Sequence, residues 1–387
     1  MRKWQERAKD IASSHMGALL ASLTYNSRAI AVLGYIAQIA PPPPEIFPLE
    51  IAVLHNIMHI PTNSFERKVF SNLDMLGCKP FVNVHDFCLA SIIRASHTTM
   101  KGWQEQWRSL KNLAVELLPL GPAHRGVLNP SWWDSKPFVA NLANAYFGEG
   151  PNTKYKNICE NLRKNCEPTT GARQLKGKKP STQALALKAI QSINGGYSFY
   201  QLLHRRCEPL GVSHLGVISP RDVRGALECA KHVNHCTAIS WLKTVTNAWC
   251  TSHRMHETSK LNCIFGCRDL PDRIDHYIIC PILWSTLHEF FGGDFPPNVF
   301  ARINFLNPCE RNLYILAAAF EIYHAIKIGL RGTVDEAVTS QRFADTLHHA
   351  RVLARDHAHR LHARERLANH DSDISQSSDN LHGVHEL

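Results

Sequence analysis

The strongest constraint on what this chain can fold into is a group of three cysteines and one histidine in its C-terminal half. They have the spacing C-x3-C-x8-H-x3-C, and they are Cys263, Cys267, His276 and Cys280. Two such pairs on either side of a short loop are the arrangement by which proteins hold tetrahedral zinc. Gly266 stands directly before the second cysteine, where it allows the tight turn that brings both sulfurs to one ion. The spacing therefore predicts a Zn2+ site held by these four residues.

The second pair is expected on a helix. His276 and Cys280 are four residues apart, so they share one face of a helix from Asp275 to Leu287, which Pro281 should bend or end. The alternative is that the four residues are unconnected parts of the core, because free cysteine is among the most buried residue types. A further set just upstream either replaces a ligand or packs beside the site: Cys250, His253 and His256.

Other residues in this segment form an ordered pattern around the four. They are Trp249, Thr251, Arg254, Asp275, Pro281 and Trp284. In this order the segment resembles the zinc-binding region that follows the polymerase domain in reverse transcriptases of non-LTR, LINE-like retroelements. The chain has one more residue between its first two cysteines than the commonest form of that region. Upstream, the segment from Thr24 to Glu50 resembles the part just beyond the catalytic palm of such enzymes.

The resemblance implies a zinc-stapled nucleic-acid-binding module, from the C-terminal part of a reverse transcriptase without its active site. A polymerase of this family needs paired aspartates for two magnesium ions, and no two aspartates are adjacent in this sequence. The sequence also lacks a phosphate-binding glycine loop with lysine, a nucleophile elbow and a dinucleotide fingerprint. We therefore expect no enzymatic activity and predict no catalytic or cofactor-binding residue other than the zinc ligands.

The charge of the chain favours a polyanionic partner. The formal net charge is +10, and Lys and Arg neutralise phosphates in the sequence-independent part of nucleic-acid binding. We predict that RNA or DNA is held mostly through its phosphates, by cations in or beside the zinc loops: Arg254, Lys260, Arg268 and Arg273. The alternative is that Asp269 and Asp272 neutralise Arg268 and Arg273 on the loop surface. Two further basic stretches are the run from Gly171 to Lys188 and a C-terminal helix rich in arginine and histidine.

The periodicity of apolar residues predicts a mainly α fold. Helical spacing with proline or glycine stops recurs along the chain, whereas long alternating runs are few. We expect a multi-helix body in two parts with a small CCHC zinc-binding module. The predicted parts are a helical domain at 1–150 resembling the post-palm region, a polar and basic linker at 151–180, a helical domain at 181–370 containing the module at 249–284, and a disordered tail at 371–387.

The compartment is inferred from cysteine usage and from the N-terminus. Twelve cysteines without regular pairing indicate reduced thiols, and Glu6 and Asp10 interrupt any signal-peptide pattern. We therefore expect a nuclear or cytoplasmic protein that is not secreted. The most apolar window, Leu313 to Ile326, is shorter than the roughly 20 residues that span a bilayer, and predicts a buried helix. The sequence leaves open the oligomeric state and the choice between RNA and DNA.

A second hypothesis comes from a different class. The chain is then a structural or interaction protein, or the product of a degenerate reading frame, whose zinc site only braces a helical domain. A chain that holds zinc but has no affinity for nucleic acid would favour this second hypothesis over the first.

Overall fold

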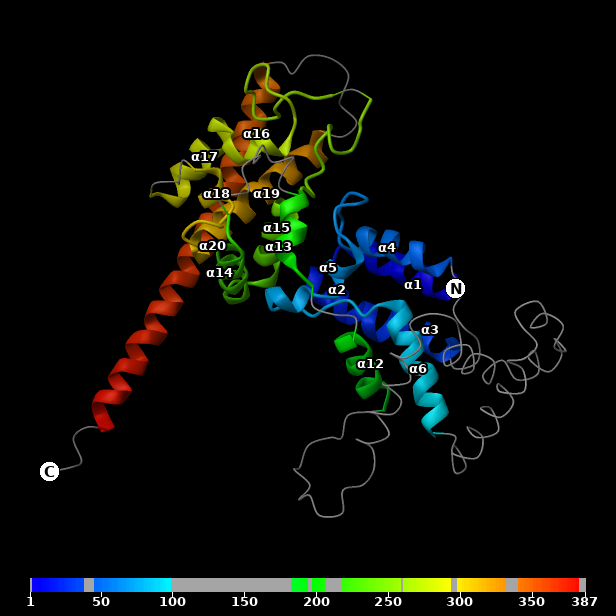
Figure 1. The fold of residues 1–387 in the computed structure, drawn as a ribbon. Coiled ribbons are helices and arrows are strands. Elements are labelled where there is room, and N and C mark those ends of the chain that lie inside the picture. The colour runs from blue at the N-terminus through cyan, green and yellow to red at the C-terminus, as the bar shows by residue number, and fades with distance from the viewer. Residues whose placement is uncertain are drawn as a thin grey trace. The chain divides into compact units, whose positions relative to one another are not determined.

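The computed structural model describes residues 2–37, 45–98, 182–193, 197–206, 218–258, 260–293, 298–330 and 340–382. This part of the chain is helical and contains no β-strand, only an isolated antiparallel bridge between Asn262 and Pro271 (Figure 1). The predicted mainly α fold is therefore confirmed. The described residues belong to two compact units. Unit 1 draws on Met1–Met58, Glu66–Asn72 and Lys79–Tyr197, and unit 2 on His59–Phe65, Leu73–Cys78 and Ser198–Leu387.

Unit 1 is built from short helices around an aromatic and aliphatic core. Its elements are α1 (Arg2–Ser13), α2 (Ala18–Thr24), the π-helix η1 (Tyr25–Ala29), α3 (Ile30–Ala37), α4 (Ile46–Ile57), α5 (Arg67–Phe70), α6 (Val84–Thr98) and α12 (Thr182–Ile193). Helix α1 buries Trp4, Ala8 and Ile11, whose three- and four-residue steps place them on one face. That face packs on α4, while α6 packs on both α3 and α12.

A buried carboxyl group lies inside unit 1. Glu50 of α4 is fully buried, and its Oε1 accepts a hydrogen bond from the backbone N–H of Val84 at 2.6 Å. The guanidinium of Arg67 lies 3.7 Å from Oε2. Burial raises the pKa of Glu50 to about 7, because removal from water disfavours the charged carboxylate more than these partners favour it.

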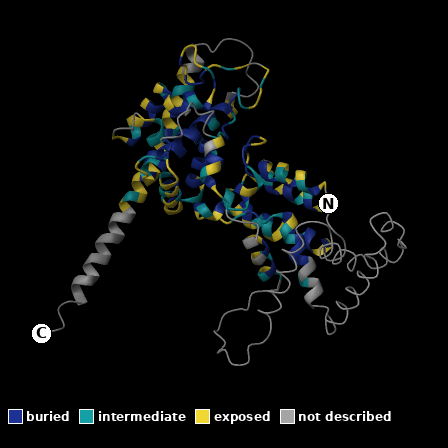
Figure 2. Cartoon of the chain, in the orientation of Figure 1, coloured by how far each residue is buried: buried dark blue, intermediate teal, exposed yellow. Residues whose placement is uncertain are grey.

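Unit 2 contains the remaining described elements. They are the 3-10 helix η2 (Leu73–Leu76), α13 (Phe199–Arg206), α14 (Pro220–His232), α15 (His235–Val245), α16 (Ile274–Ile279), α17 (Pro281–Phe291), α18 (Val299–Arg302), α19 (Glu310–Leu330) and α20 (Ser340–His382). Helix α19 packs on α14, α15, α17 and α20, and Figure 2 shows the buried residues concentrated where these helices meet. The apolar window predicted as a buried helix is therefore the centre of unit 2.

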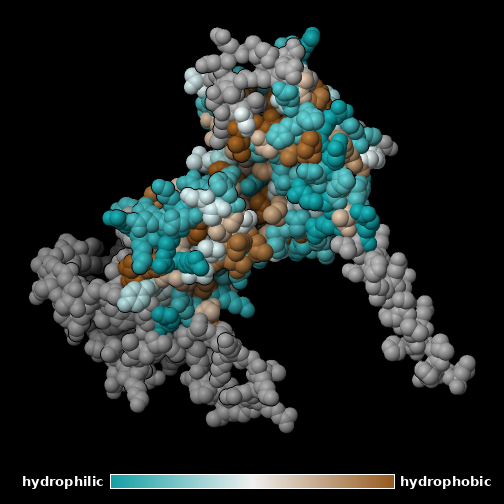
Figure 3. All heavy atoms as spheres, turned by 180° about the vertical axis from the view of Figure 1, so that it is seen from behind, coloured by the Kyte–Doolittle hydropathy of each residue, from teal (hydrophilic) through white to brown (hydrophobic). Residues whose placement is uncertain are grey.

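No helix in the described residues is both long and apolar enough to cross a membrane. The face of the molecule in Figure 3 mixes hydrophilic residues with smaller apolar patches.

The boundaries of the units differ from the predicted domains. Helix α12 was expected in the second domain, but it packs on α6 in unit 1, where Ala186 and Ile190 are buried. In the other direction, 59–65 and 73–78 belong to unit 2, where η2 packs on α14 and α15. Both associations join distant parts of the chain, which composition does not reveal. The predicted linker at 151–180 and most of the basic run from Gly171 lie outside the described residues.

Two helices end at other places than the sequence predicts. The sequence predicts a helix from Cys236 to His256 before the cysteine motif, but α15 ends at Val245 and is followed by turns, with left-handed φ angles of 56° at Asn247 and 53° at His256. At the other end of the chain, α20 continues to His382, past Asp371, where the sequence predicts a disordered tail. The segment from Ser340 to His382 contains neither glycine nor proline, so nothing in its backbone stops the helix.

We expect Glu50→Gln to remove a pH dependence of unfolding. Because the pKa of Glu50 is raised on folding to about 7, its neutral form stabilises unit 1 fully below the unfolded value of about 4.3, and this stabilisation is lost as the pH rises toward 7. Relative to the variant, the wild type should lose on the order of 1 to 3 kcal/mol of unfolding free energy between about pH 4.5 and pH 7.5. Denaturant titrations of both proteins at the two pH values measure this. Parallel pH profiles would contradict it.

Candidate metal centre

The first two cysteines are positioned by a tight loop that closes on itself. The N–H of Cys263 donates to the carbonyl oxygen of Leu270 at 2.7 Å, beside the bridge between Asn262 and Pro271. Gly266 has a φ of +90° and donates its N–H to the carbonyl oxygen of Cys263 at 3.0 Å. A residue with a Cβ rarely adopts this φ, so the glycine allows the turn between the two cysteines, as predicted.

The second pair lies at a break between two helices. His276 is in α16, and Cys280 stands between α16 and α17 with Pro281 as the first residue of α17. The Sγ of Cys280 accepts the N–H of Leu283 at 3.5 Å, as an N-cap does for one of the unpaired N–H groups of the first turn. The single helix predicted from Asp275 to Leu287 is therefore wrong, because Cys280 lies outside both helices and does not share a helical face with His276, whereas the predicted interruption at Pro281 is confirmed. Because Pro281 is at the first position of α17, it favours the new helix and removes no hydrogen bond.

The structure brings the four predicted ligands into one buried cluster. One donor atom from each of Cys263, Cys267, His276 and Cys280 can be chosen so that all lie within 4.8 Å of one another. The sulfur of Cys280 is 3.9 Å from that of Cys263 and 3.6 Å from that of Cys267. In a tetrahedral site with Zn–S bonds of about 2.3 Å, two sulfurs lie about 3.8 Å apart, whereas a disulfide needs about 2.05 Å. The spacing therefore fits an ion between the sulfurs.

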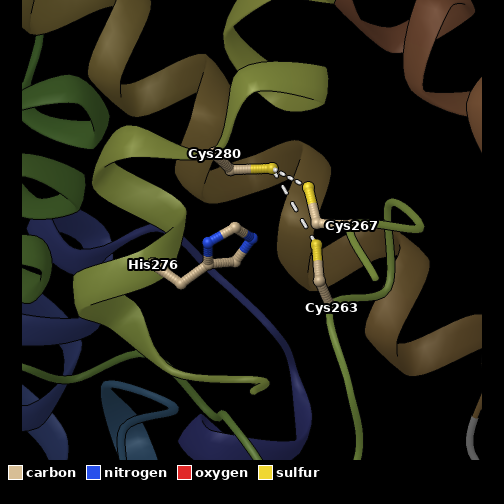
Figure 4. A group of neighbouring side chains, drawn as sticks. All are labelled: Cys263, Cys267, His276 and Cys280. Atoms are coloured by element: carbon tan, nitrogen blue, oxygen red, sulfur yellow. Dashed lines mark hydrogen bonds between the residues drawn. The ribbon is translucent and has the colours of Figure 1, made fainter. Parts of the chain in front are cut away.

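The histidine completes the set of donors. Figure 4 shows the three sulfurs facing one another and the ring of His276 turned with a nitrogen toward them. His276 is buried, and its Nε2 has no hydrogen-bond partner in the described structure. An unpaired buried nitrogen costs free energy unless something coordinates it. The residues present thus fit a metal ion with one imidazole and three sulfur ligands.

The sulfurs lie so close together that the pKa values of Cys263 and Cys280 shift in opposite directions. The hydrogen bond from Cys280 lowers the pKa of Cys263 to about 4 and raises the pKa of Cys280. Without a cation the cluster favours one thiolate supported by its neighbours, since several thiolates in a buried space repel one another. A divalent cation would compensate the charge of all three sulfurs.

The upstream alternatives do not join the cluster. Cys250 uses its backbone, donating to Nε2 of His324 at 3.2 Å and accepting from the hydroxyl of Tyr323 at 3.4 Å. His253 and His256 line a separate cavity of about 210 Å³. The alternative that the four cysteine-motif residues are unconnected is likewise wrong, since they meet at one point.

A buried aspartate, Asp272, attaches the loops to the centre of unit 2. Its Oδ1 accepts the hydroxyls of Tyr277 at 2.7 Å and Tyr323 at 2.9 Å. Its Oδ2 accepts the N–H of Ser252 at 2.6 Å and the ammonium group of Lys327 at 3.0 Å. Both carboxylate oxygens are therefore satisfied, and the carboxylate connects the segment before the cysteines, the loop between the ligand pairs and α19.

Sequence reasoning missed this role of Asp272. It offered Asp272 as a partner of arginines on the loop surface, but the side chain is fully buried. The available signal was Lys327, a lysine within the apolar stretch of α19, because a buried ammonium group needs a carboxylate partner. Burial raises the pKa of Tyr277, and the nearby carboxylate of Asp272 adds to this, so the phenol remains a hydrogen-bond donor.

Aromatic packing surrounds this connection. The ring of Trp249 is stacked on Tyr277 at 5.8 Å and lies 4.9 Å from the ring of Tyr323. The indole N–H of Trp284 donates to the carbonyl oxygen of Tyr277 at 3.0 Å. The two tryptophans that bound the segment therefore both contact Tyr277 of α16.

Among the four cations predicted to contact phosphates, Arg254 is the least available. It is half-buried and donates to the carbonyl oxygens of Asn247 at 3.2 Å and Thr62 at 3.0 Å. Burial lowers the pKa of Arg254. The guanidinium therefore joins two segments of unit 2.

The other three cations are exposed. Lys260 donates to the carbonyl oxygen of Ser252 at 3.2 Å, and Arg273 forms an ion pair with Asp275 at 3.0 Å. Arg268 is exposed and forms no ion pair with the described residues. These contacts lie on the surface, where a phosphate can replace them at little cost.

Comparison with protein-family models, curated proteins and solved structures finds no match for this chain. The interpretation of the site therefore depends on its own geometry.

We expect metal binding to depend on Cys280 and not on Cys250. Cys280→Ser removes a sulfur that lies within 3.9 Å of both other sulfurs, so the purified variant should contain far less metal than the wild type, which should contain one ion per chain. Cys250→Ser is the matched control, an equal change upstream of the cluster that should retain the ion. Elemental analysis of the three proteins checks this. Equal metal content in the Cys280 variant would rule out the site.

We also expect Asp272→Asn to destabilise unit 2 by about 2 to 4 kcal/mol, because it removes the closer and fully buried of the two carboxylates that pair with the buried ammonium group of Lys327 and leaves only Glu257 at 3.4 Å. The double variant Asp272→Asn, Lys327→Met should recover part of this loss, since it removes the buried ammonium group itself. Urea unfolding of the wild type, the single variant and the double variant measures the effect. A single variant as stable as the wild type would show that the pair contributes nothing.

Proposed function

We propose that Cys263, Cys267, His276 and Cys280 hold one Zn2+ as a structural ion. Thiolates with an imidazole are the donors that zinc prefers, whereas magnesium and calcium require oxygen ligands. All four positions are supplied by buried protein side chains, which leaves no open position for a substrate or water. A closed site of this kind stabilises a fold and does not catalyse a reaction.

The function that we propose for the folded module is nucleic-acid binding. In this proposal the chain is a zinc-stapled part of a retroelement reverse transcriptase, C-terminal to the polymerase domain and without its catalytic aspartates, and it acts in the nucleus or cytoplasm. The observation that carries it is the buried Cys3His cluster, built on a loop that presents Lys260, Arg268 and Arg273 to solvent. The net charge of +10 supports a polyanionic partner.

The residues that surround the cluster and carry the resemblance also support this proposal, because each of them makes a contact within the module. The Oγ1 of Thr251 accepts the N–H of Arg254 at 3.2 Å, and Asp275 pairs with Arg273. Pro281 begins α17, and the two tryptophans pack on α16. Every residue that carries the resemblance to the retroelement zinc region thus has a structural task in holding the module.

One observation favours the second candidate, a module that only braces a helical unit. Arg254 donates to the carbonyl oxygens of Asn247 and Thr62, which is a structural use of a cation expected to contact phosphate. If the module is only structural, the exposed cations of the loops should contribute nothing to nucleic-acid affinity.

Salt dependence separates the two candidates. The triple variant Lys260→Ala, Arg268→Ala, Arg273→Ala should flatten the slope of log affinity against log salt by roughly two to three, at somewhat under one per phosphate contact. Arg254 is left unchanged because its replacement would disturb the fold. The matched control removes three exposed lysines from unit 1, by Lys3→Ala, Lys9→Ala and Lys68→Ala, and should keep the wild-type slope. A wild type that binds no oligonucleotide at low salt would establish the structural candidate instead.

A further inference from the structure

A groove lies on unit 2 between the end of α17 and one face of α20, outside the metal centre. It encloses about 540 Å³, and we call it the α17/α20 groove. Its lining consists of Phe290, Arg355, Ala358, His359, His362, Glu365 and Arg366. The volume is within the roughly 300 to 1,000 Å³ of sites that take small organic groups. Figure 1 shows α20 running beside α17 and α19 here.

The basic groups of the groove are in a row. Arg355, His359, His362 and Arg366 are separated by four, three and four residues, which places them on one face of α20. At a rise of about 1.5 Å per residue the row is about 16 Å long. All four side chains are exposed, so the row can contact several consecutive phosphates of a strand.

The acidic group of the groove is already compensated. Glu365 pairs with Arg311 at 3.3 Å and with Nδ1 of His362 at 3.0 Å. The carboxylate of Glu365 is therefore already paired with one side chain of α19 and with one of its own helix. The guanidiniums of Arg355 and Arg366 form no ion pair with the described residues, and they keep the groove positive.

An aromatic ring lies beside these cations. Phe290 is partly exposed in the groove, and the guanidinium of Arg355 lies 5.5 Å from the centre of its ring. Single-stranded nucleic acids are held by this combination, in which bases stack on aromatic rings and planar guanidinium groups while cations follow the backbone. A duplex keeps its bases stacked inside, so it cannot place one in the groove without flipping it out.

We propose that the α17/α20 groove binds single-stranded nucleic acid, with one base against Phe290 and phosphates of the same strand, separated by the length of the row, on Arg355 and Arg366. This inference rests on the proposed nucleic-acid-binding function and locates the strand away from the zinc loops. An acidic protein segment would meet the same cations, but its aspartate and glutamate side chains carry no aromatic ring to stack on Phe290.

The test uses the full zinc-containing chain and a labelled single-stranded oligothymidylate. Phe290→Leu keeps apolar volume but removes the stacking ring, and it should weaken binding about 5- to 160-fold, the range of one stacked base. Arg355→Ala with Arg366→Ala should flatten the salt slope by about 1.4, at roughly 0.7 per contact on a single strand. The control Lys68→Ala with Arg360→Ala removes two exposed cations that do not line the groove, and should behave as the wild type.

The outcomes separate the groove from the zinc loops. If the wild type binds and both groove variants bind like the control, the inference is overturned while the proposed function stands. Equal competition by polyglutamate and by oligothymidylate for the groove would overturn it in favour of an acidic protein partner. Weakened binding in the groove variants, with metal content and helical circular dichroism unchanged, supports the groove even where the loop triple variant has no effect. A wild type without affinity for the oligonucleotide would overturn both.

Discussion

Unit 2 depends on the convergence of four donor side chains at one buried point. The segment from Cys263 to Cys280 has no regular secondary structure before α16, and a segment of this length cannot bury a core that would hold it. Three sulfurs and one imidazole replace that missing core if an ion joins them, since ion binding then supplies folding free energy. Gly266 and Pro281 make the convergence possible, because one allows the turn and the other separates two helices at the last ligand.

The loops held in this way are attached to the rest of unit 2 by a second, purely protein connection. Asp272 lies between the ligand pairs and receives bonds from both tyrosine hydroxyls and from Lys327. Because Tyr323 and Lys327 belong to α19, Asp272 joins the loops of the Cys3His cluster to the central helix. This arrangement attaches an exposed loop surface to a unit made of helices, which is what the proposed phosphate-binding function requires.

The parts that local chain geometry determines could be predicted from the sequence. The ligand spacing, the turn at Gly266, the break at Pro281 and the burial of Leu313 to Ile326 follow from neighbouring residues. The partner of Asp272 is 55 residues away, and the packing of α12 on α6 joins segments separated by more of the chain, so periodicity could not reveal either. The exposed cations near the centre were identified by position, but the internal bonds of Arg254 depend on Thr62, which is 192 residues earlier.

If an ion at the Cys3His cluster holds the loops against α19, removal of that ion should release them. Hydrogen exchange of the full chain before and after treatment with a strong chelator measures this. We expect amides from Ser252 to Cys280 to lose protection, with the effect extending to α19 around Tyr323, while α1, α4 and α6 of unit 1 keep theirs. Unchanged protection between Ser252 and Cys280 after complete loss of the metal would contradict it.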